Sequence, residues 1–368
     1  MPIIYLNYYV EDKSMKYAIL PLAIVSAFAS SAFAANVTAY GVVDTGLLYT
    51  HHSQTNLGSS DNVSMSSSIG QPTRIGLKGT ENLADGYAVS FKLENSFNTD
   101  SGEFGMKGTL FNREARLSLQ TPAGTFSFGR LGALTSGCGT YDIFMWEADS
   151  MDGGVADVIG TTIWFDRDRY NNMINYESPA IGGLTLYAQY TNGTTDDSVI
   201  GSRNKTRYAA LGGTYQVGNL SLVAVVDTVL HQSVNSQKVE DAKTISLGGN
   251  YTFNGVKLFA GFQYGKDDYT PMNDYAEPVD GYNTHLGAAI TLPCGLLQIS
   301  THYSDVETVA NKNVTAKQWG VSALHTYELS KQTSIYATAG YKHIENSNTV
   351  ETLKTKTFQA AIGVTHQF

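Results

Sequence analysis

The 368-residue chain has little charge and little cysteine, and each shortage excludes a class of protein. Charged residues make up 15% of it, against about a quarter in ordinary soluble domains. The net charge of −9 argues against a nucleic-acid partner, because such proteins need a basic face. Cys138 and Cys294 cannot build a disulfide framework and lack metal-ligand spacing. They are two free thiols or one bridge.

Long apolar runs are also scarce, and the one near the N-terminus resembles a targeting segment. Residues 15–34 read "MKYAILPLAIVSAFASSAFA" and end in a small-x-small pattern, which predicts a secretory signal peptide cut after Ala34. The preceding residues 1–14 carry Glu11 and Asp12 where a signal needs positive charge. We interpret them as an upstream mis-assignment of the start, with Met15 as the true first residue. No later run is long enough for a spanning helix.

From residue 35 to residue 368 the chain shows a period of two. The stretch "YAVSFKLENSF" places apolar side chains at 87, 89, 91 and 93, and Ser90, Lys92 and Glu94 on the other face. The final stretch, "TFQAAIGVTHQF", alternates in the same way up to Phe368. The 36 glycines and 23 tyrosines fit a β-rich protein with many turns and aromatic belts. The pattern predicts strands throughout.

The connectors between these strands alternate between short and long. Tight turns are expected at 83–86, 122–124, 180–183, 217–219, 254–255, 293–295 and 329–332, and all but the last contain Gly, Pro or Asn. Long polar connectors are expected at 51–70, 98–112, 132–170, 192–205, 232–243 and 267–280. About sixteen strands with this alternation predict an all-β, transmembrane antiparallel barrel with short periplasmic turns and long extracellular loops. A soluble β-sandwich is the alternative, but its polar faces would carry more charge.

A membrane barrel must close, because lipid cannot satisfy the backbone of an open sheet edge. The last strand is therefore expected to pair with the first, "NVTAYGVVDTGLLYT". Closure explains why the chain continues in a strand up to its terminal Phe368. That ring is expected in the aromatic girdle at the membrane boundary.

Several stretches, taken in order, resemble the Gram-negative general porins, which are trimeric, sixteen-stranded diffusion channels. They are "VTAYGVVDTGL", "TRIGLKGTENLADG", "FNREARLSLQTPAGTFSFGRLG" and "NNMINYESPAIGGLTLYAQY". The resemblance implies passive diffusion of small hydrophilic solutes and ions, a homotrimer in outer-membrane lipid, and no cofactor. It also implies that Phe368 is the signal for the outer-membrane insertion machinery.

The resemblance further implies that the third long loop folds into the lumen and presents acids to a basic wall. Here that loop spans about residues 132–170, and a connector of this length is usually functional or disordered. "MDGG" at 151–154 resembles the family's loop motif, so Asp152 is the strongest candidate on the loop side. The acidic candidates for the constriction are Asp142, Glu147, Asp149, Asp152 and Asp157.

Strand parity supplies the candidates for the basic wall. Charges on the lipid face cost about 2–4 kcal/mol at the membrane midplane, so charged residues are assigned to the lumen. Arg130 breaks this rule, because it shares a side with Phe126 and Phe128, and is expected at the loop's entrance. The basic candidates are Arg74, Lys78, Lys92, Arg116 and Arg169, and the resemblance supports Arg74 and Arg116 most directly.

The sequence leaves some functions open and argues against others. It contains no Ser/His/Asp context and no phosphate-binding loop, so we expect no enzyme, no cofactor and no catalytic or metal site. A solute-specific channel and an adhesin or receptor on the same barrel stay open. Ion preference also stays open, because Asn175 and Glu177 stand where many porins have an arginine.

Overall fold

A computed structural model describes residues 37–151, 165, 167–194, 205–232, 239–269 and 277–368. Most of the described chain is β-strand, and the described helix is α2 (Ile143–Ala148). None of the described helices is long and apolar enough to cross a membrane. The predicted signal segment, residues 15–34, lies outside the described residues.

Apart from β1, which has 17 residues, the strands of the first half are shorter than those of the second half. The first half comprises β1 (Thr38–Gln54), β2 (Gly58–Ser67), β3 (Arg74–Asn82), β4 (Ala88–Ser96), β5 (Glu114–Thr121), β6 (Gly124–Gly132), β7 (Arg169–Glu177) and β8 (Leu184–Thr191). The second half comprises β9 (Arg207–Val217), β10 (Leu220–Leu230), β11 (Ala242–Phe253), β12 (Val256–Asp268), β13 (Val279–Leu292), β14 (Gly295–Thr308), β15 (Thr315–Glu328), β16 (Thr333–Ser347) and β17 (Thr352–Gln367).

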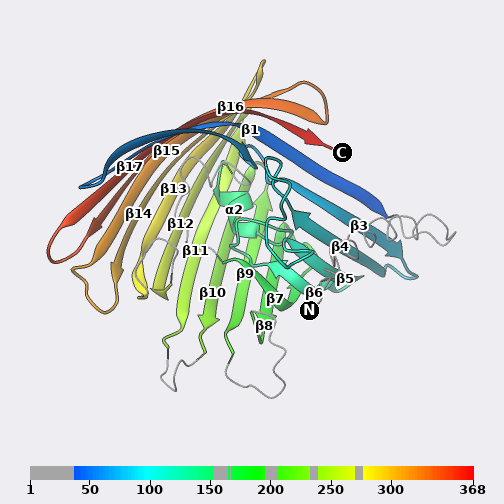
Figure 1. Cartoon of the computed structure of the whole chain (residues 1–368). Coiled ribbons are helices and arrows are strands. Elements are labelled where there is room, and N and C mark those ends of the chain that lie inside the picture. Colours follow the sequence, from blue (N-terminus) through cyan, green and yellow to red (C-terminus); the bar gives the residue numbers. More distant parts are fainter. Residues whose placement is uncertain (1–36, 152–164, 166, 195–204, 233–238, 270–276) are drawn as a thin grey trace, which may run out of the picture.

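The strands form one closed antiparallel sheet (Figure 1). β1 pairs with β17 along one edge, and along the other it pairs first with β3 and then with β2. Because β2 and β3 follow one another along the same edge of β1, the barrel has sixteen positions around its circumference. At the seam, the backbone N–H of Phe368 donates to Gly41 O and the N–H of Gly41 donates to Phe368 O, both at 3.1 Å. The predicted barrel and its closure are confirmed.

The connectors agree with the prediction except at 51–70. Each of the seven predicted tight turns separates two paired strands. The segment 51–70 was expected to be a polar loop, but β1 continues to Gln54 and β2 returns along it as a hairpin. Polar residues form this hairpin, and Tyr49 OH donates to Asp61 Oδ1 at 2.6 Å. The backbone hydrogen bonds and such polar contacts hold the hairpin together. Its sequence therefore has no alternation of apolar residues, which is the pattern that predicts strands elsewhere in the chain.

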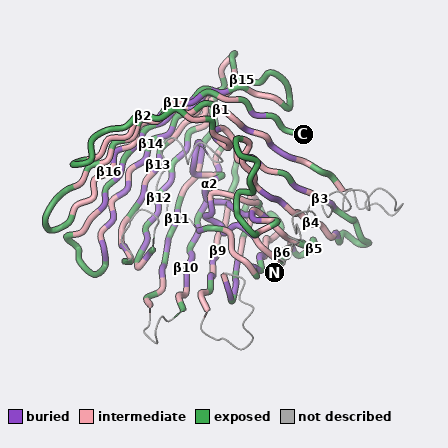
Figure 2. Tube along the Cα trace, viewed as in Figure 1, coloured by how far each residue is buried: buried purple, intermediate pink, exposed green. Residues whose placement is uncertain are grey.

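The two faces of the sheet carry different side chains, and buried and exposed residues alternate along the strands (Figure 2). On β12, Phe262 and Tyr264 are exposed on the outer face while Gln263 between them is buried toward the lumen. Aromatic pairs such as Phe262–Tyr282 and Trp319–Tyr341 join neighbouring strands on the outer face. An apolar outer face with aromatic girdles and a polar interior is the pattern of a barrel in lipid.

A corner between β2 and β3 projects inward and is tied to the wall by one carboxylate. Asp44 on β1 is buried and accepts hydrogen bonds from the backbone N–H groups of Ile69, Gly70 and Gln71 at 2.7–3.1 Å. Tyr336 OH donates to the same carboxylate at 3.0 Å. Five charge-assisted bonds, the fifth from the Thr365 hydroxyl, satisfy this buried acid without a cation. They fix the corner immediately before Arg74.

Candidate functional site

The connector between β6 and β7 is here called the inward loop, and its described residues, 133–151, 165, 167 and 168, lie inside the barrel. Its helix α2 buries Ile143, Phe144, Met145 and Ala148 in one apolar cluster. The same cluster contains lumenal side chains of β9, β10 and β11, namely Tyr208, Ala210, Val223, Val225, Val229 and Ala242. Figure 1 shows α2 within the ring of strands. The prediction that the third long loop folds into the lumen is confirmed.

The loop is also fastened to the far wall by Arg167. Its guanidinium is buried, and Nε donates to Asp227 Oδ1 on β10 at 2.7 Å while Nη2 lies 2.8 Å from Asp268 Oδ2 on β12. Nη2 also donates to Thr244 Oγ1 at 2.6 Å. Burial by itself would lower the pKa of Arg167, but the two carboxylates hold it well above its ordinary value. Arg167 therefore stays charged and joins the loop to three strands.

Opposite this attachment, a buried acid organises three cations, which lie on β3, on β4 and immediately before β5. Glu94 Oε1 accepts a hydrogen bond from Arg113 Nε at 2.6 Å. Glu94 Oε2 lies 3.5 Å from Lys92 Nζ and 3.6 Å from Arg74 Nε, and accepts from Tyr40 OH at 2.8 Å. The Glu94 side chain is only 4% exposed, whereas Arg74 is 25% exposed. The acid is enclosed and the cations reach the lumen.

A second buried acid extends this cluster. Glu114 Oε2 accepts from Lys92 Nζ at 2.7 Å, and Glu114 Oε1 forms an ion pair with Arg116 Nε at 2.7 Å. Thr140 of the inward loop donates to Glu114 Oε1 at 2.9 Å. Arg116 Nη1 also donates to Tyr141 OH of the loop at 3.2 Å. We call Arg74, Lys92, Glu94, Arg113, Glu114 and Arg116 the cationic cluster, because its four cations exceed its two carboxylates.

The cationic cluster borders a cavity of about 580 Å³ in the lumen. Arg74, Lys92, Glu94 and Arg113 line one part of it. The inward corner contributes Gly70, Gln71 and Pro72, and the inward loop contributes Gly137–Thr140, Trp146 and Met151. The passage is thus narrowed by both inward segments. Net positive charge on one wall of a narrow aqueous passage attracts anions and orients polar solutes.

Three of the five predicted basic residues, Arg74, Lys92 and Arg116, meet in the cationic cluster. Lys78 lies four residues farther along β3, with Nζ 5.1 Å from the centre of the Tyr40 ring. Arg169 begins β7 and lies 3.7 Å from Asp168. Neither Lys78 nor Arg169 lines the cavity. A role for these residues in ion passage stays a prediction.

Three of the five predicted loop acids, Asp142, Glu147 and Asp149, lie in the described part of the inward loop and help to hold it in place. Asp142 caps α2 by accepting from the backbone N–H of Met145 at 3.2 Å. Glu147 Oε2 accepts from Asn250 on β11 at 2.6 Å, and Asp149 Oδ1 lies 3.4 Å from His285 Nε2 on β13. Asp152 and Asp157 lie outside the described residues. The idea that loop acids face the basic wall stays a prediction.

Sequence reasoning missed Glu94, Glu114, Arg113 and Arg167. Parity already placed Glu94 on the lumenal face with Lys92, and a lumenal acid two residues from a lumenal lysine was the available signal. Arg113 precedes the first residue of β5, so strand parity did not apply to it. Arg167 lies in the loop, where no period exists to orient a side chain.

The two cysteines are both free in the structure. Cys138 lines the cavity and Cys294 lies in a turn at the start of β14. Burial raises the pKa of the Cys138 thiol to about 11. The thiolate is the reactive form of cysteine, so this side chain is expected to be unreactive at neutral pH.

Comparison with known proteins identifies the family that this architecture belongs to. Residues 22–349 match the family model described as Gram-negative porin. The chain belongs to the Gram-negative porin family. It is 27% identical to an outer membrane porin protein of Bordetella pertussis over 407 aligned residues, which cover 96% of this chain and 100% of that protein. It is 24% identical to outer membrane porin protein 32 of Delftia acidovorans, with 91% and 92% of the two chains covered.

The fold of this porin is shared with solved structures. An anion-selective porin from Comamonas acidovorans superposes with a TM-score of 0.68 at 22% identity, covering 90% of this chain and 99% of that one. The outer membrane channel DcaP of Acinetobacter baumannii superposes with a TM-score of 0.63 at 18% identity, covering 92% and 99% of the two chains. The protein is therefore an outer-membrane channel of a Gram-negative bacterium, through which small hydrophilic solutes and ions diffuse passively.

Proposed function

We propose that this porin is a general diffusion channel with a preference for anions. The observation that carries this proposal is the cationic cluster, in which four cations are organised around two buried carboxylates beside the lumenal cavity. The carboxylates are the most deeply buried members, at 4% and 1% exposure of their side chains. An ion in the passage therefore meets the guanidinium and ammonium groups first.

Passage of neutral solutes separates a general channel from a solute-specific one. Liposomes containing the purified porin are expected to swell in isosmotic solutions of neutral sugars, more slowly as the sugar grows. The rate should rise in proportion to sugar concentration, because a general channel has no site to fill. A rate that saturates for one sugar would instead support the solute-specific alternative. The adhesin or receptor alternative is tested by deleting an extracellular loop. If the liposomes still swell but the protein no longer binds to cells, the porin also has a receptor role.

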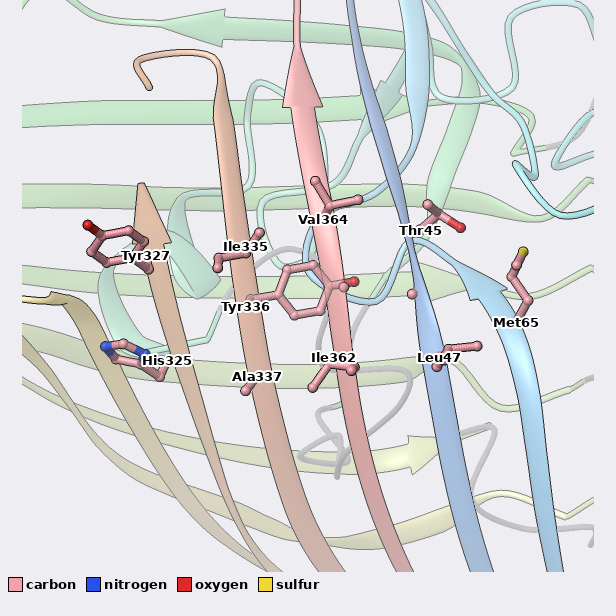
Figure 3. A pocket seen from close by; sticks show the side chains of 12 residues that line it. Thr45, Leu47, Met65, His325, Tyr327, Ile335, Tyr336, Ala337, Ile362 and Val364 are labelled. Carbon is pink, nitrogen blue, oxygen red and sulfur yellow. The ribbon is translucent and has the colours of Figure 1, made fainter. Parts of the chain in front are cut away.

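We also propose that the porin assembles as a homotrimer through its first and last strands. A groove of about 700 Å³ crosses the outer face of β1, β2 and β15–β17 (Figure 3). Leu47, Met65, Ile362 and Val364 line it. Small residues on β1, including Thr45, permit close packing of a neighbouring barrel. Native mass spectrometry of the detergent-solubilised protein is expected to give the mass of three chains, and a monomer would refute the proposal.

We further propose that residues 15–34 are a signal peptide and that the mature chain starts at Ala35. The sequence pattern supports this proposal. N-terminal sequencing of protein purified from outer membranes would test it, because a first residue upstream of Ala35 is inconsistent with cleavage after Ala34. We infer as well that the porin has no enzymatic activity. The family's role as channels supports this, and phospholipid hydrolysis by the pure protein would disprove it.

Removal of Phe368 is expected to reduce insertion into the outer membrane severalfold. Its backbone closes the seam with Gly41, and its ring covers that glycine. Without it, the end of β17 loses both backbone bonds, and the insertion machinery is expected to lose its signal. Trimer yield in isolated outer membranes measures the effect. Phe368→Tyr keeps the backbone pairing and the ring, so it should assemble normally, and a normal yield of the truncated protein would contradict the assignment.

A further inference from the structure

The cavity beside the cationic cluster also has an apolar side. Trp146 and Met151 of the inward loop, with Leu324 of β15 and Tyr336 of β16, line the cavity that Arg74, Lys92 and Arg113 border. Met151, Leu324 and Tyr336 are buried and pack with Ile69 in one cluster, which seats the loop against β15 and β16. Trp146 is outside this cluster and stays open to the cavity. A cavity with a cationic side and an apolar side matches a solute that has both an anionic group and an apolar group.

Trp146 is the most accessible of these apolar groups. It is 59% exposed, although Ile143, Phe144 and Met145 in the same helix are buried. The buried residues pack against the β9–β11 wall, and the helix directs Trp146 to its other side, toward the channel. Across the described chain, the ring-stacking and cation–π contacts involve other aromatic rings. The indole therefore presents a free face to a passing solute.

The cations that border the cavity keep part of their side chains open. Lys92 is 20% exposed and Arg113 12%, and Arg74 is the most exposed of the three. Glu94 holds them at fixed positions without covering them. An incoming carboxylate can accept charge-assisted hydrogen bonds from such groups, and arginine forks suit its two oxygens. Pre-positioned donors bind such a group at a lower entropic cost than mobile ones.

We propose that this cavity is a transient binding subsite for small aromatic carboxylates. The ring of the solute stacks on Trp146 while its carboxylate faces Arg74, Lys92 and Arg113. A volume of about 580 Å³ leaves room for water around such a molecule, so the subsite retains it briefly and still lets it pass. The proposal rests on the proposed function as an anion-preferring channel, and it adds a class of solute that the channel selects.

Block of the ionic current by added anions tests the subsite. Channels in planar bilayers are studied in potassium chloride while sodium benzoate or sodium acetate is added at equal concentrations. Benzoate is expected to reduce the current in a saturable manner, at concentrations about tenfold below those at which acetate acts, since aromatic contacts are worth about 0.5–1.5 kcal/mol beyond the area they bury. Trp146→Leu should remove most of this difference, and Trp146→Phe should retain part of it.

A matched control uses Trp319→Leu, because Trp319 lies on the outer face of β15, away from the lumen. Benzoate and acetate should block the current through this variant as they do in the wild type. Equal block by benzoate and acetate in the wild type would overturn the subsite while leaving the channel intact. Unchanged discrimination in Trp146→Leu would overturn it as well. A wild-type protein that is folded but carries no current would refute the proposed function, and the subsite with it.

Discussion

Replacement of both Arg74 and Arg116 by serine is expected to shift the channel's preference from anions toward cations. The cationic cluster would then hold Lys92 and Arg113 against Glu94 and Glu114, and its net positive charge would vanish. One unit charge about 4 Å from a passing ion changes its energy by about 1 kcal/mol in water. The chloride-to-potassium permeability ratio is thus expected to fall at least about fivefold. The reversal potential under a gradient of potassium chloride reports this ratio.

A double substitution elsewhere controls for the change in total charge. Lys243 on β11 and Lys266 on β12 face each other across the ladder on the outer surface. Replacing both by serine removes the same charge from outside the channel, so the reversal potential should stay at the wild-type value. An equal shift in the two variants, or none in either, would show that the cationic cluster does not set the ion preference.

Replacement of Arg167 by methionine is expected to loosen the inward loop. It would leave Asp227 and Asp268 as buried acids without their cation, and removing one partner of a buried ion pair typically costs about 3–5 kcal/mol. The loop is expected to detach from the wall while the barrel stays folded, because the hydrogen bonds between strands do not depend on Arg167. Single-channel recordings should therefore show a larger and noisier conductance in a barrel that remains intact.

Two further variants make this prediction specific. Lys312→Met removes an exposed ion pair with Glu307, which is worth roughly 0–1 kcal/mol, and should leave the conductance unchanged. Adding Asp227→Asn and Asp268→Asn to Arg167→Met removes the unpaired charges and should largely restore the low-noise conductance of the wild type. If Arg167→Met conducts like the wild type, the loop is held without this network.

Most of the barrel could be predicted from the sequence, because strands in lipid obey a strict alternation. The alternation along residues 87–97 places Lys92 and Glu94 on the face opposite the apolar side chains, and both lie in the lumenal cationic cluster. Six of the seven turns contain Gly, Pro or Asn, which favour tight turns, and the seventh, at 329–332, is polar without them. The β1–β2 hairpin was missed because its polar residues carry no apolar alternation.

The lumen was harder to predict, since its details depend on three-dimensional neighbours. Parity placed Arg74, Lys92 and Arg116 inside, but it could not show that Glu94 and Glu114 would bind them. A register shift between Gly129 and Leu131 explains why Arg130 broke the parity rule. Its guanidinium donates to Asn112 O at 2.8 Å, at the entrance of the loop as expected. The acids of the loop were assigned to the constriction only by resemblance to the porin family. Helix α2 is too short to show a helical period in the sequence, so it could not be predicted.

The most direct test of the account is the single-channel current of the purified, refolded wild-type porin in a planar bilayer with a potassium chloride gradient. We expect stepwise insertions, in groups of three, and a reversal potential of the sign that chloride permeation produces. A reversal potential of the opposite sign would contradict the role of the cationic cluster. A silent bilayer, with the protein shown to be folded, would contradict the open channel itself.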